Sequence, residues 1–206
     1  MNAAASTRAR RAFSFDRVVI PTVLQRAWSR IAVGMLVLFV LLLFPDKPEP
    51  LGIPPGKLPP TLQWVEEEGR FANTILQVGL PVLTRDLRAL CQLGAIAVTS
   101  ITATHGLKRA LNDVQVDGIR LGQRPASPRS KHNVPSGHAS LAASGALFVC
   151  TRYGWKWGWL VWPILVLTLI ARVALDAHTI TGVLTGAVVG LSTTWAFVTR
   201  RREGAV

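Results

Sequence analysis

The chain has 206 residues, a formal net charge of +12, and a hydrophobic content of 50%. Its apolar residues gather in long runs instead of the short periodic stripes of a water-soluble core, which indicates a membrane protein. The arginines flank these runs and do not alternate with exposed aromatic residues, so the charge does not indicate nucleic-acid binding. At about 20 residues per span, this length leaves room for a single domain of five or six helices.

The N-terminal region is strongly basic, since residues 1–30 contain six arginines and a single acidic residue, Asp16. The positive-inside rule therefore predicts a cytoplasmic tail over residues 1–30. A first span is predicted from about Ile31 to Phe44, with an earlier start in the amphipathic stretch Val18–Trp28 as an alternative. No small-residue cleavage site follows Phe44, so this run is interpreted as a retained span and not as a signal peptide.

The next region is rich in proline and includes three consecutive glutamates, Glu66 to Glu68. This composition predicts an external loop and a surface helix over residues 45–70. Span 2 is predicted from about Phe71 to Thr84, although it is short and contains Pro81. Span 3 follows at Leu87 to Leu107. In an alternative topology span 2 does not cross, and the loop after span 3 is cytoplasmic.

The loop from Lys108 to Pro135 is polar and contains six lysines and arginines. Three further spans and a second basic tail follow it, at about 136–150, 157–175, 180–198 and 200–206. An even number of spans places both termini in the cytoplasm and the loop outside, where its charge departs from the positive-inside rule. Binding an anion would explain that charge. The predicted fold class is an all-α polytopic membrane protein with about six transmembrane helices, and its membrane domain covers residues 31–199.

A short motif, Pro135-Ser136-Gly137-His138, stands where this basic loop meets span 4. The unpaired N–H groups at a helix N-terminus bind phosphate, with help from the helix dipole. Ser136 can add its hydroxyl, and Gly137 allows a phosphate to approach the backbone closely. His138 is placed to exchange a proton with an ester oxygen. Taken alone, the motif also fits an ordinary helix cap.

A second group of polar residues follows near the end of span 5, where Arg172 stands in an apolar run and His178 comes six residues later. Two spans separate His138 from His178, so both histidines return to one membrane face, together with Lys108 and Arg124. A buried arginine is costly in a membrane and is expected to meet a partner or ligand; snorkelling to the interface is the alternative. Without these neighbours, His178 would read as a hydrogen-bonded core histidine.

The order and spacing of these motifs resemble the type 2 phosphatidic acid phosphatase superfamily. The matching elements are Arg124-Pro125, the Pro-Ser-Gly-His run at 135–138, and Arg172 followed after five residues by His178. The resemblance covers about residues 84–199 and is closest to bacterial lipid A phosphatases. It implies that His178 attacks phosphorus to form a phosphohistidine, while His138 protonates the departing oxygen. Arg124 and Arg172 would then clamp the phosphoryl oxygens, and Lys108 would add a third positive charge.

Two positions depart from the family pattern. The family lysine lies seven residues before the arginine, whereas Lys108 precedes Arg124 by sixteen, so Arg109, Arg120 and Lys131 are alternatives for that role. The family aspartate, which orients the nucleophilic histidine, falls at Gly182. Gly182 begins a ladder of glycines, completed by Gly186 and Gly190, that allows close helix packing. Asp176 is the first candidate for a replacement orienting group; Thr179 and Thr181 are other candidates.

The predicted function is that of an integral enzyme of the bacterial inner membrane with its active site facing the periplasm. It would hydrolyse a lipid-linked phosphate or diphosphate of the lipid A, undecaprenyl diphosphate or phospholipid type. No acidic cluster suggests a metal site, so the reaction is predicted to need neither a metal ion nor a cofactor. The bilayer and the lipid substrate are the expected partners. A lipid phosphotransferase and a non-catalytic lipid-phosphate-binding protein are the alternatives, and the oligomeric state is left open.

Overall fold

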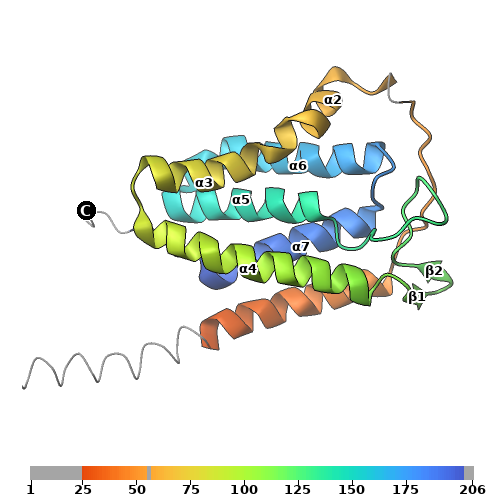
Figure 1. Cartoon of the computed structure of the whole chain (residues 1–206), viewed down its shortest axis with the longest axis horizontal. Helices are drawn as coiled ribbons and strands as arrows, with labels where there is room; N and C mark the ends of the chain where they lie inside the picture. Colours follow the sequence, from red (N-terminus) through yellow and green to blue (C-terminus); the bar gives the residue numbers. More distant parts are fainter. Residues whose placement is uncertain (1–24, 55–56, 202–206) are drawn as a thin grey trace, which may run out of the picture.

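The computed structural model describes residues 25–54 and 57–201, which form a bundle of long helices running roughly parallel and antiparallel to one another (Figure 1). In this part of the chain, four helical stretches are long and apolar enough to cross a membrane: Gln25–Leu43, Leu87–Ala110, Trp155–Ala174 and Ile180–Phe197. The all-α membrane fold is therefore confirmed, while six spans remain a prediction. Most of the predicted N-terminal tail and the end of the C-terminal tail lie outside the described residues.

The helices follow the predicted spans closely. After the first helix, Gln25–Leu43, they are α2 (Pro60–Glu67), the short η2 (Gly69–Phe71), α3 (Ala72–Leu83), α4 (Leu87–Ala110), α5 (Gly137–Tyr153), η3 (Trp155–Trp157), α6 (Gly158–Ala174) and α7 (Ile180–Phe197). A small hairpin, β1 (Gln115–Val116) and β2 (Ile119–Arg120), lies in the basic loop. The helices α3 and α5 have 12 and 17 residues, fewer than the roughly 20 of a full span. The first helix already includes Gln25, in agreement with the earlier of the two predicted starts.

Helix α5 lies at the centre of the bundle, where α3, α6 and α7 pack against it (Figure 1). The glycine ladder of α7 faces it: a Cβ added at Gly186 or Gly190 would overlap the carbonyl oxygen of Ser136 or Ser140, respectively. The two backbones are therefore in direct contact, as the spacing of the glycines predicts. This contact brings the beginning of α7 against the segment that leads into α5.

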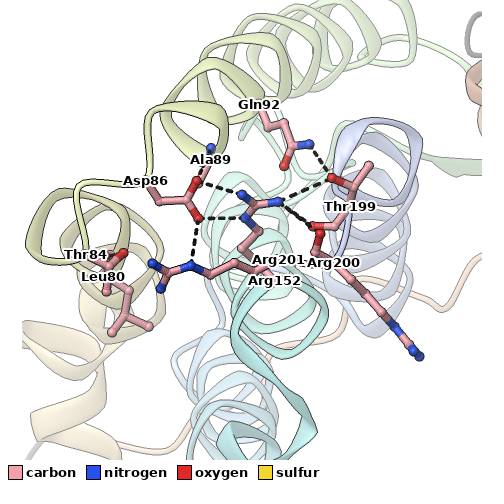
Figure 2. A network of polar contacts seen from close by, with 9 residues as sticks. All are labelled: Leu80, Thr84, Asp86, Ala89, Gln92, Arg152, Thr199, Arg200 and Arg201. Atoms are coloured by element: carbon pink, nitrogen blue, oxygen red, sulfur yellow. Dashed lines mark hydrogen bonds and ion pairs between the residues drawn. The ribbon is translucent and has the colours of Figure 1, made fainter. Parts of the chain in front are cut away.

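A buried ion pair joins several helix ends at one end of the bundle (Figure 2). Asp86 precedes α4 and accepts a hydrogen bond from the backbone N–H of Ala89 at 3.0 Å. Its carboxylate also accepts bonds from Arg152, at 2.8 Å from Nε and 2.7 Å from Nη2. Arg152 donates in turn to the carbonyl oxygens of Thr199 and Arg200. The start of α4, the last turn of α5 and the residues after α7 are thus tied together.

The opposite end of the bundle holds the predicted catalytic residues. The C-terminal ends of α4 and α6 meet the N-terminal ends of α5 and α7 there, beside the loop that carries the hairpin (Figure 1). The segment from Phe71 to Asp86 runs from this end to the other, since Phe71 contacts His138 at the start of α5 and Asp86 pairs with Arg152 at its end.

Candidate active site

The N-terminus of α5 forms the floor of the site. Ser136 caps the helix in an extended conformation, and its backbone N–H donates to the carbonyl oxygen of Gly182 at 2.8 Å. Its hydroxyl oxygen is buried and has no hydrogen-bond partner among the described residues. Gly137 leaves room beside the backbone, and Lys108 Nζ lies 4.0 Å from where a Cβ of Gly137 would stand. Free helix N–H groups, a hydroxyl and an ammonium group thus face one point, which suits an anion.

Three cationic side chains converge on this point. Arg172, in the last turn of α6, is only 8% exposed, and Arg124 in the basic loop is half-buried. Both have a buried Nε that has no hydrogen-bond partner in the part of the chain that the structure describes. Burial, and then the charge of Arg172, lower the pKa of Arg124. Arg124 and Arg172 are also close enough to Lys108 to repel its ammonium group. Three cations that repel one another, with unused donors, form a site that a phosphate would stabilise.

The alternatives for the lysine of the family pattern lie elsewhere. Arg109 and Lys131 are exposed to solvent. Arg120 forms hydrogen bonds within the basic loop, where its Nη2 donates to the carbonyl oxygens of Pro128 at 3.0 Å and Ser130 at 2.7 Å. Of the four predicted candidates, the structure brings Lys108 to the site.

His178 stands in the short connection between α6 and α7 and is 2% exposed. Its Nδ1 lies 2.7 Å from the carbonyl oxygen of Asn133. Because a carbonyl only accepts hydrogen bonds, Nδ1 carries the proton and Nε2 keeps its lone pair. Burial, then the charges of Arg172 and Arg124, lower the pKa of His178 to about 3. The imidazole is therefore neutral at pH 7, as a nucleophile must be.

The prediction that Asp176 orients His178 is wrong. Asp176 lies in a left-handed turn, with φ of 53°. The carboxylate instead accepts hydrogen bonds from the backbone N–H groups of Leu51 at 2.7 Å and Gly52 at 3.1 Å. The structure gives the orienting position to the carbonyl oxygen of Asn133.

The two threonines that were other candidates for this role are bonded elsewhere. Thr179 accepts from Asn133 Nδ2 at 2.9 Å, and its backbone N–H donates to Asn133 Oδ1 at 3.0 Å. Thr181 accepts from the backbone N–H of Asp46 at 3.1 Å. The reciprocal bonds between Asn133 and Thr179 fix the Asn133 backbone beside the adjacent His178.

Gly182, where the family pattern has aspartate, lies against the same asparagine. A Cβ at this position would stand 2.7 Å from Asn133 Oδ1 and 3.0 Å from its carbonyl oxygen. Asn133 therefore occupies the space that an aspartate side chain would need. Glycine at position 182 thus leaves room for Asn133, whose carbonyl oxygen bonds to His178 in place of the family carboxylate.

His138, at the start of α5, is half-buried and close to the same cations. Arg172 and Lys108 are near enough to interact electrostatically with both His138 and His178, so both histidines lie close to the same cations. The ring of Phe71 approaches His138 edge to face, with 6.2 Å between the ring centroids. In the described part of the chain, no three His, Cys, Asp or Glu side chains gather in a way that would hold a metal ion.

Three residues at the site were not identified from the sequence: Glu66, Phe71 and Asn133. Glu66 pairs with Arg172, with 2.5 Å between Oε1 and Nη1. Glu66 belongs to a run of three glutamates that is typical of an external loop. The only indication of its role was that an acidic run is unusual in so basic a chain and could supply the partner expected for the buried Arg172. Phe71 and Asn133 carried no spacing signal, because their contacts depend on how the helices pack.

Comparison with known proteins agrees with these motifs. The family model of the PAP2 superfamily matches residues 88–203, which contain both histidines and the three cations. The chain belongs to the PAP2 superfamily. Two lipid A 1-phosphatases of Helicobacter pylori, from strains ATCC 700392 / 26695 and J99, are each 35% identical over 173 residues. These alignments cover 84% of this chain and 87% and 86% of the two relatives.

A third relative is the lipid A 4'-phosphatase of Helicobacter pylori strain J99, which is 31% identical over 169 residues and aligned over 81% of this chain and 82% of its own length. No solved structure matches the chain. With its apolar helices, the chain is thus a membrane lipid phosphatase of the PAP2 superfamily. The superfamily match begins at residue 88, so Glu66 and Phe71 lie before the matched region.

Proposed function

We propose that this PAP2 superfamily member hydrolyses a phosphate of lipid A through a phosphohistidine intermediate. The main observation behind this mechanism is that two histidines lie near three cations, Lys108, Arg124 and Arg172. Three buried donor atoms there, Ser136 Oγ, Arg124 Nε and Arg172 Nε, have no hydrogen-bond partner among the residues that the structure describes. The substrate rests on the relatives, and the higher identity to the 1-phosphatases, 35% against 31%, favours the 1-phosphate over the 4'-phosphate.

In the first step, the lone pair of His178 Nε2 attacks phosphorus, and the bond between phosphorus and the lipid oxygen breaks. His138 donates a proton to that oxygen, so the lipid leaves as an alcohol. Arg124, Arg172 and Lys108 bind the non-bridging oxygens, on which negative charge is spread during the transfer. The Asn133 carbonyl keeps the proton on Nδ1 throughout, as the orienting group of a catalytic histidine does.

In the second step, water attacks phosphorus of the phosphohistidine, and His138 accepts a proton from that water. The bond between phosphorus and Nε2 breaks, which returns the lone pair to His178 and releases inorganic phosphate. The two steps together consume one lipid phosphate and one water, and both histidines return to their starting states. No step requires a metal ion, so a chelator should leave the rate unchanged.

We also propose that the active site faces the periplasm from the inner membrane. Basic residues at the opposite end of the bundle support a cytoplasmic position for that end: Arg26, Arg30, Arg85, Arg88, Arg152, Lys156, Arg200 and Arg201. The path of residues 71–86 along the whole of α5 supports a crossing by span 2 and hence an even number of spans. The charge of the basic loop is then explained by the phosphate site.

The deciding experiment incubates the purified protein with lipid A, undecaprenyl diphosphate and phosphatidylglycerol phosphate, and measures free phosphate and the masses of the lipid products. We expect phosphate release from lipid A with loss of the 1-phosphate. Substituting His178→Gln should abolish turnover and phosphoenzyme formation, whereas His138→Gln should mainly slow the departure of a poor leaving group. Transfer of labelled phosphate from one lipid to another would identify a phosphotransferase. Lipid binding without phosphate release or phosphate transfer would identify a non-catalytic protein.

A further inference from the structure

A segment before the superfamily match also reaches the active site. The α2–η2 segment, residues 60–71, lies beside α6 and rises at an angle from α3 at the site end of the bundle (Figure 1). Two of its side chains contact residues of the proposed mechanism: Glu66 binds Arg172, and Phe71 lies against His138. The segment is therefore placed to control the geometry of both.

Glu66 holds one end of the Arg172 guanidinium. Its Oε1 accepts from Arg172 Nη1 at 2.5 Å and from Arg70 Nη1 at 2.8 Å. The Arg172 side chain is 9% exposed, so little water competes for this bond. A guanidinium is planar and its donors point in fixed directions. Fixing Nη1 therefore also fixes the direction in which Nε presents its hydrogen. This Nε is buried and has no partner within residues 25–54 and 57–201.

A carboxylate on a phosphate-binding arginine can also act as a competitor of the phosphate. Such a competitor is expected to take both donors of the Nε edge, as carboxylates and phosphates do in bidentate pairs. Here Glu66 accepts from Nη1, and Nε has no partner among the residues described. Arg70, which belongs to the α2–η2 segment, also donates to Glu66 Oε1, and its guanidinium lies 4.9 Å from the centre of the Phe71 ring. The geometry is that of a support behind Arg172.

We propose that Glu66 is a positioning residue for Arg172, and that the α2–η2 segment forms one wall of the phosphate site by holding Arg172 through Glu66 and His138 through Phe71. This inference rests on the proposed function for the role of Arg172. It predicts that phosphate is bound by an arginine whose orientation depends on an acidic residue outside the superfamily match.

The test compares Glu66→Ala with Glu66→Gln and with the control Glu67→Ala, which removes an exposed carboxylate from the same helix. Loss of the acceptor in Glu66→Ala frees Arg172 to rotate, so kcat should fall by about tenfold or more while KM changes less. Glu66→Gln keeps an oxygen acceptor and should recover most of the rate. Glu67→Ala should match the wild type. A rate in Glu66→Ala equal to or above that of the wild type would overturn the proposal and identify Glu66 as a competitor.

A double variant separates positioning from a general structural role. If Glu66 acts through Arg172, then Glu66→Ala should add no further loss to Arg172→Gln, whereas additive losses would overturn the proposal. Binding of inorganic phosphate, followed by 31P NMR, gives a second measure that does not depend on turnover. We expect weaker binding in Glu66→Ala than in Glu66→Gln or Glu67→Ala, and equal binding in all three would contradict the inference. If the wild type releases no phosphate from any lipid, the proposed function fails while this binding measurement still decides the role of Glu66.

Discussion

The neutral, singly oriented imidazole of His178 is the central feature at the scale of single residues. A nucleophilic histidine needs a lone pair on the nitrogen that faces phosphorus and a fixed proton on the other nitrogen. In the PAP2 pattern an aspartate supplies the second condition. Here the Asn133 carbonyl supplies it. Burial, then the charges of Arg172 and Arg124, lower the pKa of His178, and the hydrogen bond to the neutral Asn133 carbonyl offsets only part of this lowering.

This arrangement predicts the titration of His178. Its pKa of about 3 lies below the ordinary value of 6.5, so the ring should still be neutral at pH 5 in the free enzyme. In the unfolded chain the ring gains a proton below about pH 6.5, so its contribution to stability is complete above that pH and is lost as the pH falls toward 3. Histidine 15N NMR, assigned by comparison with His178→Gln, should show a protonated Nδ1 and an unprotonated Nε2 at pH 5. A doubly protonated ring at pH 5 would contradict this assignment.

A second prediction concerns Gly182. Because a Cβ would stand 2.7 Å from Asn133 Oδ1, both Gly182→Ala and Gly182→Asp should displace Asn133 and lower kcat by about tenfold or more. Asp176→Asn should leave kcat nearly unchanged, since that carboxylate binds Leu51 and Gly52 instead of the imidazole. Steady-state rates of the three folded variants check this account. A faster Gly182→Asp enzyme would show that the native site merely lacks its aspartate.

These residues also show how far the sequence could predict the site. The meeting of His138, His178, Lys108, Arg124 and Arg172 followed from counting antiparallel spans, because a chain that crosses twice returns to the same end. The role of Asp176 could not be judged in this way, since it depends on one left-handed turn. Asn133 was missed because it acts mainly through its backbone, and a carbonyl group is common to every residue type.

At the scale of the helices, the two ends of α5 have different tasks. Its N-terminus faces the proposed phosphate site, whereas Arg152 in its last turn pairs with Asp86, and these two side chains are only 4% and 6% exposed. The hydrogen bonds from Arg152 are the main reason that the pKa of Asp86 is lowered. The stability contributed by this carboxylate is present above its ordinary pKa and is lost as the pH falls through the lowered value.

The ion pair between Asp86 and Arg152 predicts a change in stability that does not alter the catalytic rate. Asp86→Ala leaves the buried Arg152 unpaired and removes the N-cap of α4, which should destabilise the fold by about 3–5 kcal/mol. Thermal unfolding in detergent should show a clearly lower Tm for this variant, and Arg88→Ala, which changes an exposed residue two positions later, serves as the control. The rate per folded molecule should stay near that of the wild type, because the pair lies at the end of the bundle away from the histidines. Loss of activity in a folded Asp86→Ala protein would contradict this separation.

At the scale of the whole molecule, the lengths of the helices follow from what surrounds them. The apolar runs at Leu87–Ala110 and Ile180–Phe197 predicted long helices well, because apolar length is what a bilayer demands. Helix α5 is shorter and rich in small residues, and 11 of its 17 residues are buried by neighbouring helices. Hydropathy alone describes such an interior helix poorly, since its surroundings are protein and not lipid.

The orientation of the molecule gives the last prediction. If the basic loop is periplasmic, a membrane-impermeant thiol reagent should label Arg129→Cys in intact spheroplasts, because Arg129 is exposed while the neighbouring Ser130 is held by hydrogen bonds to Arg124 and Ser127. Lys156→Cys, at the opposite end of the bundle, should be labelled only after the membrane is opened. Both variants are made in a Cys91→Ser background, since Cys91 is the exposed native thiol. The reverse labelling pattern would place the loop in the cytoplasm, and the charge of residues 108–135 would then follow the positive-inside rule without reference to phosphate.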